Sequence, residues 1–328
     1  MPGIWHLAML RHGAVRPDRS SRHRRLVATL LIVACLAVVV PGAIGAVRYG
    51  VTFWLYRGFP APAAPPSVIP ATVQTIVVTS PALGGYPDKV VVVLPPGYAS
   101  QPTRRYPVLY LLHGVPGAPS NFITIGDVAT DEATLVAEGR MQPLILVMPT
   151  GGRSFLADNE WADGVRPGNG WETFVARDLV RAIDARYRTI AAGPSRGLGG
   201  LSEGGYGALN IGLHHPGEFG LLESWSGYMI ADNNPAIFDH SEALLRYNSP
   251  ADQVRVVAPE LAVAGTYIWF YCGKSDELAG QNRAFDAELT SLGLAQDFFE
   301  QPGPHNWALW RRLMPQALIT ASEHLRHG

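Results

Sequence analysis

The feature that most constrains this chain is a glycine-rich segment at residues 198–208, which reads Leu-Gly-Gly-Leu-Ser-Glu-Gly-Gly-Tyr-Gly-Ala. Its centre, residues 200–204, has the pattern Gly-x-Ser-x-Gly, which is typical of a nucleophile elbow. In such an elbow a strand ends, the chain turns sharply at the serine, and a helix begins. Gly200 and Gly204 are expected to let that strand and helix approach each other. The segment therefore predicts a strand–turn–helix unit with Ser202 at its apex, and the alternative is an ordinary glycine-rich turn.

The chain from about residue 72 onward alternates apolar runs with helical patterns. This alternation is typical of a mostly parallel central sheet with helices on both faces, and it predicts one α/β domain over residues 72–328. The predicted strands are Val73–Thr79, Lys89–Leu94, Val108–Leu112, Leu144–Met148, a segment ending near Leu201, Leu221–Ser224, Tyr267–Cys272 and Gln296–Glu300. The predicted helices are Ala129–Glu138, Trp171–Tyr187, Gly204–His214, Gln281–Leu292 and Trp307–Arg326. Residues 228–262 fit the alternation poorly, so we expect a cap or a long loop there.

The N-terminal region contains an uncharged apolar run over residues 26–47. At 1.5 Å per residue a helix of this length covers roughly 33 Å, which is enough to cross a bilayer. Six arginines precede the run against one acid, and two arginines follow it closely, so the positive-inside rule places the N-terminus in the cytoplasm. We therefore predict a basic cytoplasmic tail at 1–25, a transmembrane signal anchor at 26–48 and a proline-rich linker at 49–71.

Three other interpretations of the apolar run stay open. A signal peptide could be cleaved near residues 43–46, residues 32–35 resemble a lipoprotein cleavage box, and the run could be a buried core helix. The chain has two cysteines. Because Cys35 falls within the apolar run and Cys272 is alone in the predicted domain, no disulfide is expected within the domain.

The chain has a formal net charge of −1, which gives no reason to expect nucleic-acid binding. No cluster of His, Cys and carboxylate residues has the spacing of a metal site, so we expect no metal and no cofactor. The oligomeric state is left open.

A serine nucleophile needs a histidine to take its proton and an acid to orient that histidine. In folds with a nucleophile elbow, the acid and then the histidine follow the serine along the chain. His305 lies in a turn after the last predicted strand, so we expect it to be the base. His240 lies in the poorly patterned segment and remains an alternative. The other histidines that follow Ser202 are predicted near helix ends: His214, His215, His324 and His327.

The best candidate for the acid is Asp276. It follows the predicted strand Tyr267–Cys272, and sites in open α/β sheets form at the carboxyl ends of strands. Glu277 is its nearest rival. Asp286 is predicted on a helix face, and Asp297 within or just before a strand.

An oxyanion hole requires two backbone N–H groups that point at the developing negative charge. One is expected from Glu203, the residue after the nucleophile, and the other from Val115, after the segment Leu111-Leu112-His113-Gly114. His113 precedes Ser202 in the chain, so we expect it to have a structural role.

Several further segments carry a resemblance to a known family. They are Ser80-Pro81-Ala82-Leu83-Gly84, Leu94-Pro95-Pro96-Gly97-Tyr98, Tyr106 to Gly114, Val147-Met148-Pro149, Trp171-Glu172-Thr173-Phe174, the elbow, Asn248-Ser249-Pro250, His305-Asn306-Trp307 and Trp310. Over roughly residues 72–315, the sequence resembles the esterase D and feruloyl-esterase-like family of α/β-hydrolases, which includes mycolyltransferases. The resemblance implies an α/β-hydrolase fold with Ser202 as nucleophile, Asp276 as acid and His305 as base. It also implies backbone donors at Val115 and Glu203.

The sequence departs from the family at position 203, where many relatives have Met. A carboxylate near an oxyanion is unfavourable unless the side chain turns away. Three tryptophans, Trp161, Trp307 and Trp310, could line an apolar acyl or glycan pocket, and burial in the core is the alternative for each.

The predicted function is a membrane-anchored serine carboxylesterase that acts outside the membrane on an ester or acyl-lipid substrate. Two alternatives are an envelope acyltransferase, which would move the acyl group to a sugar hydroxyl, and a non-catalytic envelope-binding protein.

Overall fold

The computed structural model describes residues 19–51, 68–154 and 156–328. The chain divides into two units, Met1–Trp54 and Leu55–Gly328. Most of the predicted cytoplasmic tail at 1–25, and most of the predicted linker at 49–71, lie outside the described residues.

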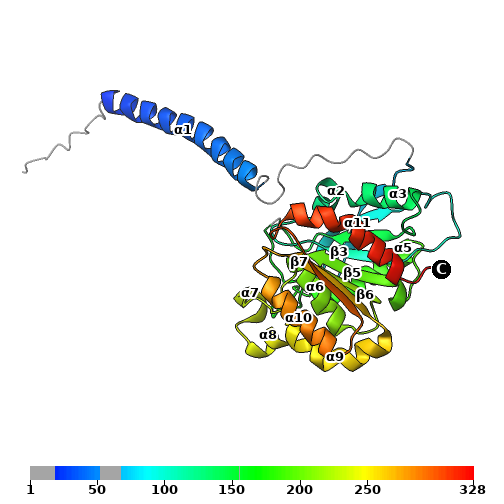
Figure 1. The fold of residues 1–328 in the computed structure, drawn as a ribbon. Coiled ribbons are helices and arrows are strands. Elements are labelled where there is room, and N and C mark those ends of the chain that lie inside the picture. The colour runs from blue at the N-terminus through cyan, green and yellow to red at the C-terminus, as the bar shows by residue number, and fades with distance from the viewer. Residues whose placement is uncertain (1–18, 52–67, 155) are drawn as a thin grey trace, which may run out of the picture. The chain divides into compact units, whose positions relative to one another are not determined.

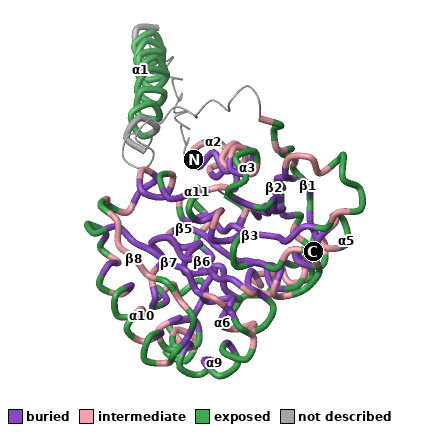
Figure 2. The backbone as a smooth tube through the Cα atoms, turned by 45° about the vertical axis from the view of Figure 1, so that its right-hand side comes forward, coloured by how far each residue is buried: buried purple, intermediate pink, exposed green. Residues whose placement is uncertain are grey.

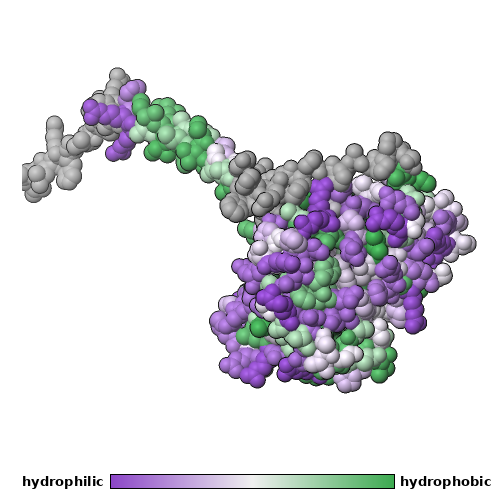
Figure 3. All heavy atoms as spheres, viewed as in Figure 1, coloured by the Kyte–Doolittle hydropathy of each residue, from purple (hydrophilic) through white to green (hydrophobic). Residues whose placement is uncertain are grey.

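The first unit contains one long helix, α1 (Arg19–Val51). Residues 23–47 of this helix are exposed, and Figure 3 shows hydrophobic residues along most of its visible face. The segment His23–Val47 has a mean hydropathy of 2.7 over its most apolar window, so it is long and apolar enough to cross a membrane. By length and composition it matches the predicted span.

The second unit is built around an eight-stranded sheet in the order β1-β2-β4-β3-β5-β6-β7-β8. Strand β2 is antiparallel to both of its neighbours, and all the other neighbouring strands run parallel. The strands are β1 (Thr72–Thr79), β2 (Pro87–Leu94), β3 (Val108–Leu112), β4 (Ile145–Pro149), β5 (Arg196–Leu201), β6 (Leu221–Trp225), β7 (Tyr267–Gly273) and β8 (Gln296–Gln301). The prediction of a mostly parallel sheet is therefore confirmed.

Two hydrophobic cores lie on opposite faces of this sheet. The side chains of β3 alternate between them, with Val108 and Tyr110 in one core and Leu109 and Leu111 in the other. Strands buried on both faces read as continuous apolar runs, which is why β3 and β4 have no charged or amide side chain. Figure 2 shows buried residues along the central strands and stretches of exposed residues on the outer helices.

Helices cover both faces (Figure 1). The first core is closed by α4 (Trp171–Thr173), α5 (Val180–Arg186), α6 (Glu203–His214), α9 (Pro250–Ala264) and α10 (Ala279–Ser291). The second core is closed by α2 (Ser120–Thr124), α3 (Val128–Ala137) and α11 (Trp307–His324). Between α4 and α5 the chain continues as a π-helical segment, Phe174–Leu179. This arrangement is the α/β-hydrolase fold.

The segment 228–262 is not the long loop that was one of its two predicted forms, and its role as a cap stays a prediction. It contains α7 (Pro235–Phe238), α8 (Glu242–Tyr247) and α9. Helix α9 begins with Pro250, where a missing N–H is tolerated, and ends at Gly265, whose φ of 67° suits a left-handed C-cap. The two short helices have too few turns to show an amphipathic period, which is why the sequence pattern did not reveal them.

Candidate active site

Ser202 stands between the end of β5 and the start of α6, as the elbow pattern predicts. Its φ is 55°, a strained value for a residue with a side chain, and its N–H donates to Trp225 O at 2.9 Å. A Cβ on Gly200 or Gly204 would lie 2.4 or 1.9 Å from Leu112 O. Both positions therefore require glycine, because β5 and α6 pass close to the end of β3, and Ser202 lies between them at the carboxyl end of β5.

The structure brings Ser202, His305 and Asp276 into one hydrogen-bonded series. His305 Nε2 lies 2.9 Å from Ser202 Oγ, and His305 Nδ1 lies 2.9 Å from Asp276 Oδ2. The Asp276 side chain is fully buried, whereas that of His305 is 25% exposed. This arrangement can move a proton from the hydroxyl to the ring, because the carboxylate favours the Nδ1–H tautomer and leaves Nε2 free to accept.

Asp276 is positioned by the turn that follows β7. Its N–H donates to Gly273 O, and its Oδ1 accepts from the N–H of Leu278 at 3.0 Å. Burial raises the pKa of Asp276, but the hydrogen bond with His305 and the charge of that ring outweigh burial, so the pKa is lowered overall. The acid is therefore held as a carboxylate.

His305 is positioned by the start of α11. The next residue, Asn306, caps that helix by accepting from the N–H of Ala308. The ring of Trp310, one turn into the helix, packs edge-on against the His305 ring at 5.1 Å. The imidazole is thus held from the side as well as through its two nitrogens.

The other candidate histidines contact residues other than Ser202 and Asp276. His113 is buried, with Nδ1 2.9 Å from Gly114 O and Nε2 2.5 Å from Thr150 O, so it joins two loops as a structural residue. Burial lowers its pKa, although these two hydrogen bonds raise it. The remaining candidates contact other groups: His214 and His215 bind Glu172, His240 binds Asn233, His324 stacks on Tyr267, and His327 binds Ser322 O.

The two expected oxyanion donors, Val115 and Glu203, line one pocket together with Ser202. This pocket, which we call the Ser202 pocket, has a volume of about 240 Å³. Its lining residues are Val115, Asp158, Glu160, Ser202, Glu203, Tyr228 and Asp232. Helix α6 begins at Glu203, and the N–H groups of Gly205 and Tyr206 donate to Ser202 O, so the positive end of the helix faces Ser202.

The side chain of Glu203 is bound by the loop that follows β4. Its Oε1 accepts from the N–H of Glu160 at 2.9 Å and from the N–H of Asn159 at 3.4 Å. Burial raises the pKa of Glu203 well above its usual value, and the nearby carboxyls Glu160 and Asp158 raise it further. The raised pKa lowers the tendency of Glu203 to carry a negative charge beside Ser202.

Sequence reasoning missed four residues of the Ser202 pocket: Asp158, Glu160, Tyr228 and Asp232. They follow β4 and β6, far apart in the sequence. Their only signal is a position after the carboxyl ends of parallel strands, and most loop residues share that position. Tyr228 stacks on Tyr206, with ring centroids 4.4 Å apart, and its hydroxyl donates to Glu160 Oε2.

The three tryptophans predicted to contact substrate are buried in the cores. Trp161 is 1% exposed and donates from Nε1 to His113 O at 3.0 Å, while Trp307 and Trp310 are each 3% exposed in the core under α11. The Ser202 pocket is lined by none of them. All three tryptophans therefore pack in the cores, which was the alternative prediction for each.

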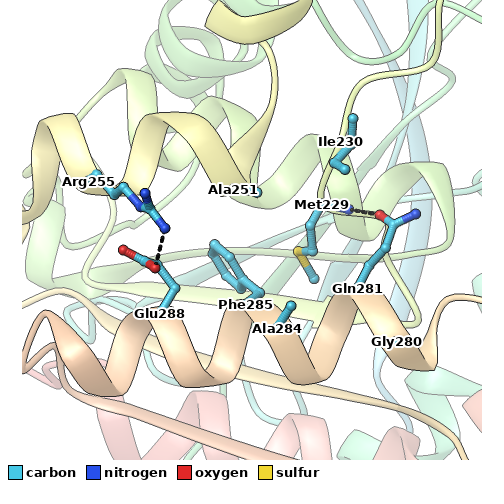
Figure 4. A pocket seen from close by; sticks show the side chains of 9 residues that line it. All are labelled: Met229, Ile230, Ala251, Arg255, Gly280, Gln281, Ala284, Phe285 and Glu288. Carbon is cyan, nitrogen blue, oxygen red and sulfur yellow. Dashed lines mark hydrogen bonds and ion pairs between the residues drawn. The ribbon is translucent and has the colours of Figure 1, made fainter.

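A second cavity, of about 360 Å³, lies between α9 and α10 (Figure 4). Its lining includes the apolar side chains Met229, Ile230 and Phe285, and an ion pair between Arg255 and Glu288 at 2.6 Å stands at one end. Ser202, Asp276 and His305 do not line it. Among the described residues, no group of three or more His, Cys, Asp or Glu side chains is placed to hold a metal ion.

Comparison with known proteins identifies the family. The Esterase family model matches residues 80–321, which is most of the chain. The chain belongs to the Esterase family. This agrees with the resemblance inferred from the motifs, and the matched range includes Ser202, Asp276 and His305.

Relatives within the family carry esterase and acyltransferase names. An esterase of Mycobacterium tuberculosis is 33% identical over 250 residues, which are 67% of this chain and 53% of the relative, so the chain spans about half of that protein. The diacylglycerol acyltransferase/mycolyltransferase Ag85B of Mycolicibacterium smegmatis is 28% identical over 336 residues, with 88% of this chain and 93% of the relative covered. The solved structure of a ferulic acid esterase superposes with a TM-score of 0.71 at 26% identity, covering 78% of this chain and all of that one.

Proposed function

We propose that this esterase is a serine carboxylesterase that works through an acyl-enzyme, with Ser202 as nucleophile, His305 as base and Asp276 as acid. The observation that carries the proposal is the hydrogen-bonded series in which His305 lies 2.9 Å from both partners. Membership of the Esterase family supports it.

In the proposed reaction, His305 Nε2 takes the Ser202 proton as Oγ attacks the ester carbonyl. The oxyanion of the tetrahedral intermediate is stabilised by the backbone N–H groups of Val115 and Glu203 and by the positive end of α6. The protonated His305 then donates its proton to the leaving alcohol, which leaves the acyl group on Ser202. Water, deprotonated by the same ring, attacks the acyl-enzyme and releases the acid.

Transfer of the acyl group to a sugar hydroxyl is the second candidate, and the observation that favours it is the similarity to the mycolyltransferase Ag85B. Both candidates share the acyl-enzyme and differ in the acceptor. Incubation with an acyl glycolipid and trehalose distinguishes them, because a transferase forms acylated trehalose whereas an esterase releases the free acid alone.

The third candidate is a non-catalytic envelope-binding protein. It predicts that a fluorophosphonate probe does not label Ser202. The intact hydrogen-bonded series supports labelling instead, because the probe reacts with an activated serine.

We also propose that residues 26–48 form an uncleaved signal anchor with the catalytic domain outside the membrane. The length and hydropathy of His23–Val47 and the arginines that precede residue 26 support this. Release of the full chain from membranes by carbonate washing, or an N-terminus that begins after residue 46, would contradict it.

The decisive experiment compares the full chain in detergent with its Ser202→Ala variant on short acyl esters. The variant is expected to lose at least about 10³-fold in kcat/KM, with an unchanged thermal unfolding midpoint as the control for folding. Equal activity of the two proteins would overturn the proposal.

A further inference from the structure

The chain segment at the end of β6 holds the backbone of Ser202. The N–H of Ser202 donates to the carbonyl oxygen of Trp225, the last residue of β6, at 2.9 Å. Gly227 lies two residues further on, and a Cβ there would lie 2.7 Å from the carbonyl carbon of Gly205 in the first turn of α6. The segment 225–227 is therefore packed against the elbow, so its position affects the position of Ser202.

The backbone of this segment is strained at Ser226. Its φ is 56°, in the left-handed region that a residue with a side chain rarely adopts. Such a conformation persists only where the surrounding contacts hold it. The N–H of Ser226 donates to Tyr271 O at 2.7 Å, and Asn282 Nδ2 donates to Gly227 O at 2.9 Å. Asn282 is thus one of the contacts that hold the strained segment.

The same side chain also binds the turn that carries Asp276. Asn282 lies near the start of α10 and is fully buried. Its Nδ2 donates to Leu278 O at 3.0 Å, and the N–H of Leu278 donates to Asp276 Oδ1 at 3.0 Å. One amide group therefore joins the segment that holds Ser202 to the turn that holds Asp276.

An amide is suited to this link. Its NH2 group has two N–H donors, and the two carbonyl oxygens, of Gly227 and Leu278, use both of them, whereas a hydroxyl group has one. The other polar atom, Asn282 Oδ1, is buried and has no hydrogen-bond partner in the described part of the chain. A buried acceptor without a partner is unfavourable, so the two donors are what this side chain contributes.

The neighbouring residue, Gln281, holds the same loop at a second point. Its Oε1 accepts from the N–H of Met229 at 2.9 Å (Figure 4). Tyr228, which lines the Ser202 pocket, lies between the two residues whose backbones are bound, Gly227 and Met229. The start of α10 therefore binds the loop on both sides of Tyr228.

We propose that Asn282 is a positioning residue, which sets the separation of Ser202 and Asp276 so that His305 can join them. The inference rests on the proposed esterase function, because it concerns the same three side chains. Asn282 does not line the Ser202 pocket, so it acts through the backbones of Gly227 and Leu278. A small displacement of reacting groups can reduce a rate by about 10²-fold.

The test compares Asn282→Ala with Asn210→Ala, each in the full chain in detergent. Asn210 is a matched control, because it is fully buried on a helix and its Oδ1 also lacks a partner among the described residues. Its Nδ2 donates to Asn248 Oδ1 at 3.0 Å. Both variants lose a buried amide and should have a lower thermal unfolding midpoint. Only Asn282→Ala should have a lower kcat for 4-nitrophenyl butanoate, by about 10- to 100-fold.

The kinetic constants distinguish a positioning role from a purely structural one. The same three residues are proposed to serve both formation and hydrolysis of the acyl-enzyme, so both steps should slow together in Asn282→Ala. Equal slowing of both steps lowers kcat and leaves KM within about twofold. The rate constant for labelling of Ser202 by a fluorophosphonate should fall as well. Rates are divided by the fraction of the chain that the probe finally labels, so unfolded protein is not counted.

Asn282→Ser covers the case in which the alanine variant does not fold. Its hydroxyl can donate to Leu278 O within the helix and has no second hydrogen for Gly227 O, so kcat should still fall at least about tenfold.

Three results would overturn the inference. Activity of the Asn282 variants equal to that of Asn210→Ala would do so and leave the esterase assignment intact. Failure of both Asn282 variants to fold, with Asn210→Ala folded, would show that the residue is only structural. Absence of hydrolysis and of labelling in the wild-type chain would overturn the esterase assignment and the inference together.

Discussion

Two clusters in this protein combine a buried carboxylate with histidine, and they differ in what the ring contacts on its other side. In the first, His305 joins Asp276 to the hydroxyl of Ser202. In the second, Glu172 binds both His214 and His215, with Oε2 2.9 Å from His214 Nδ1. The other nitrogen of His214 lies 2.7 Å from Tyr247 O.

The comparison shows that a histidine–carboxylate pair is not by itself a catalytic device. A peptide carbonyl accepts a hydrogen bond and has no proton to give, so His214 joins α6 to the end of α8. A serine hydroxyl has a proton to give, so His305 can act as a base. We therefore expect changes in the first cluster to alter activity and changes in the second to alter stability.

The largest expected effect is that of Asp276→Asn. The amide would favour the wrong tautomer of His305, so kcat/KM for short esters should fall about 10³- to 10⁴-fold while the thermal unfolding midpoint changes little. Steady-state kinetics together with thermal unfolding measure both quantities. Near-normal activity of Asp276→Asn would contradict the proposed role of Asp276. Glu277→Gln, which changes the neighbouring acid, is the control variant.

The next effect concerns Glu172. Burial raises the pKa of this carboxyl, but the hydrogen bonds from His214 and His215 outweigh burial and lower it from its usual 4.5 to about 2. A lowered pKa stabilises the folded state above about pH 4.5, and this stability is lost as the pH falls from 4.5 to 2. Glu172→Gln should therefore reduce the free energy of unfolding by about 3 kcal/mol at pH 7.

Urea unfolding of the wild-type chain and of Glu172→Gln at pH 7 and at pH 3 checks this prediction. The difference in unfolding free energy between the wild-type chain and Glu172→Gln should be smaller at pH 3 than at pH 7. The kcat/KM of the variant at pH 7 should equal that of the wild type. Loss of activity with full stability would mean that the second cluster serves catalysis, and the contrast between the two clusters would fail.

The smallest effect is expected for His215→Ala. The side chain of His215 is 19% exposed and makes one of the two hydrogen bonds to Glu172, so its loss should cost about 1 kcal/mol of unfolding free energy. His240→Ala provides the comparison. Because His240 is exposed, its loss should reduce the unfolding free energy by less than the loss of His215. Equal costs, measured by urea unfolding, would show that the bond to Glu172 contributes nothing.

Much of the fold and the central three residues of the site could be predicted from the sequence. Apolar runs of the right length mark β3 and β4, because these strands are buried on both faces, whereas β5 could be placed only from the elbow that follows it. Ser202 could be located because the elbow requires Gly200 and Gly204 within two residues of it. Asp276 and His305 each follow a strand closely, so the position of the strand places the side chain.

The surroundings of Ser202 were decided by tertiary structure alone. The Glu203 side chain accepts from the N–H groups of Asn159 and Glu160, and those residues lie over forty positions earlier in the chain. The three tryptophans could equally well have lined a pocket. Trp161 instead donates to His113 O within the first core, and Trp307 and Trp310 face the second core from α11.

The sequence by itself thus determined the fold class and the chain order of the proposed nucleophile, acid and base, because these depend on contacts that are local in the chain or follow directly from strand order. Only the tertiary structure decided what surrounds Ser202. The loops after β4 and β6 carry Asp158, Glu160, Tyr228 and Asp232 into one pocket. Their meeting depends on how separate loops pack against each other, and no periodic pattern in the sequence encodes that packing.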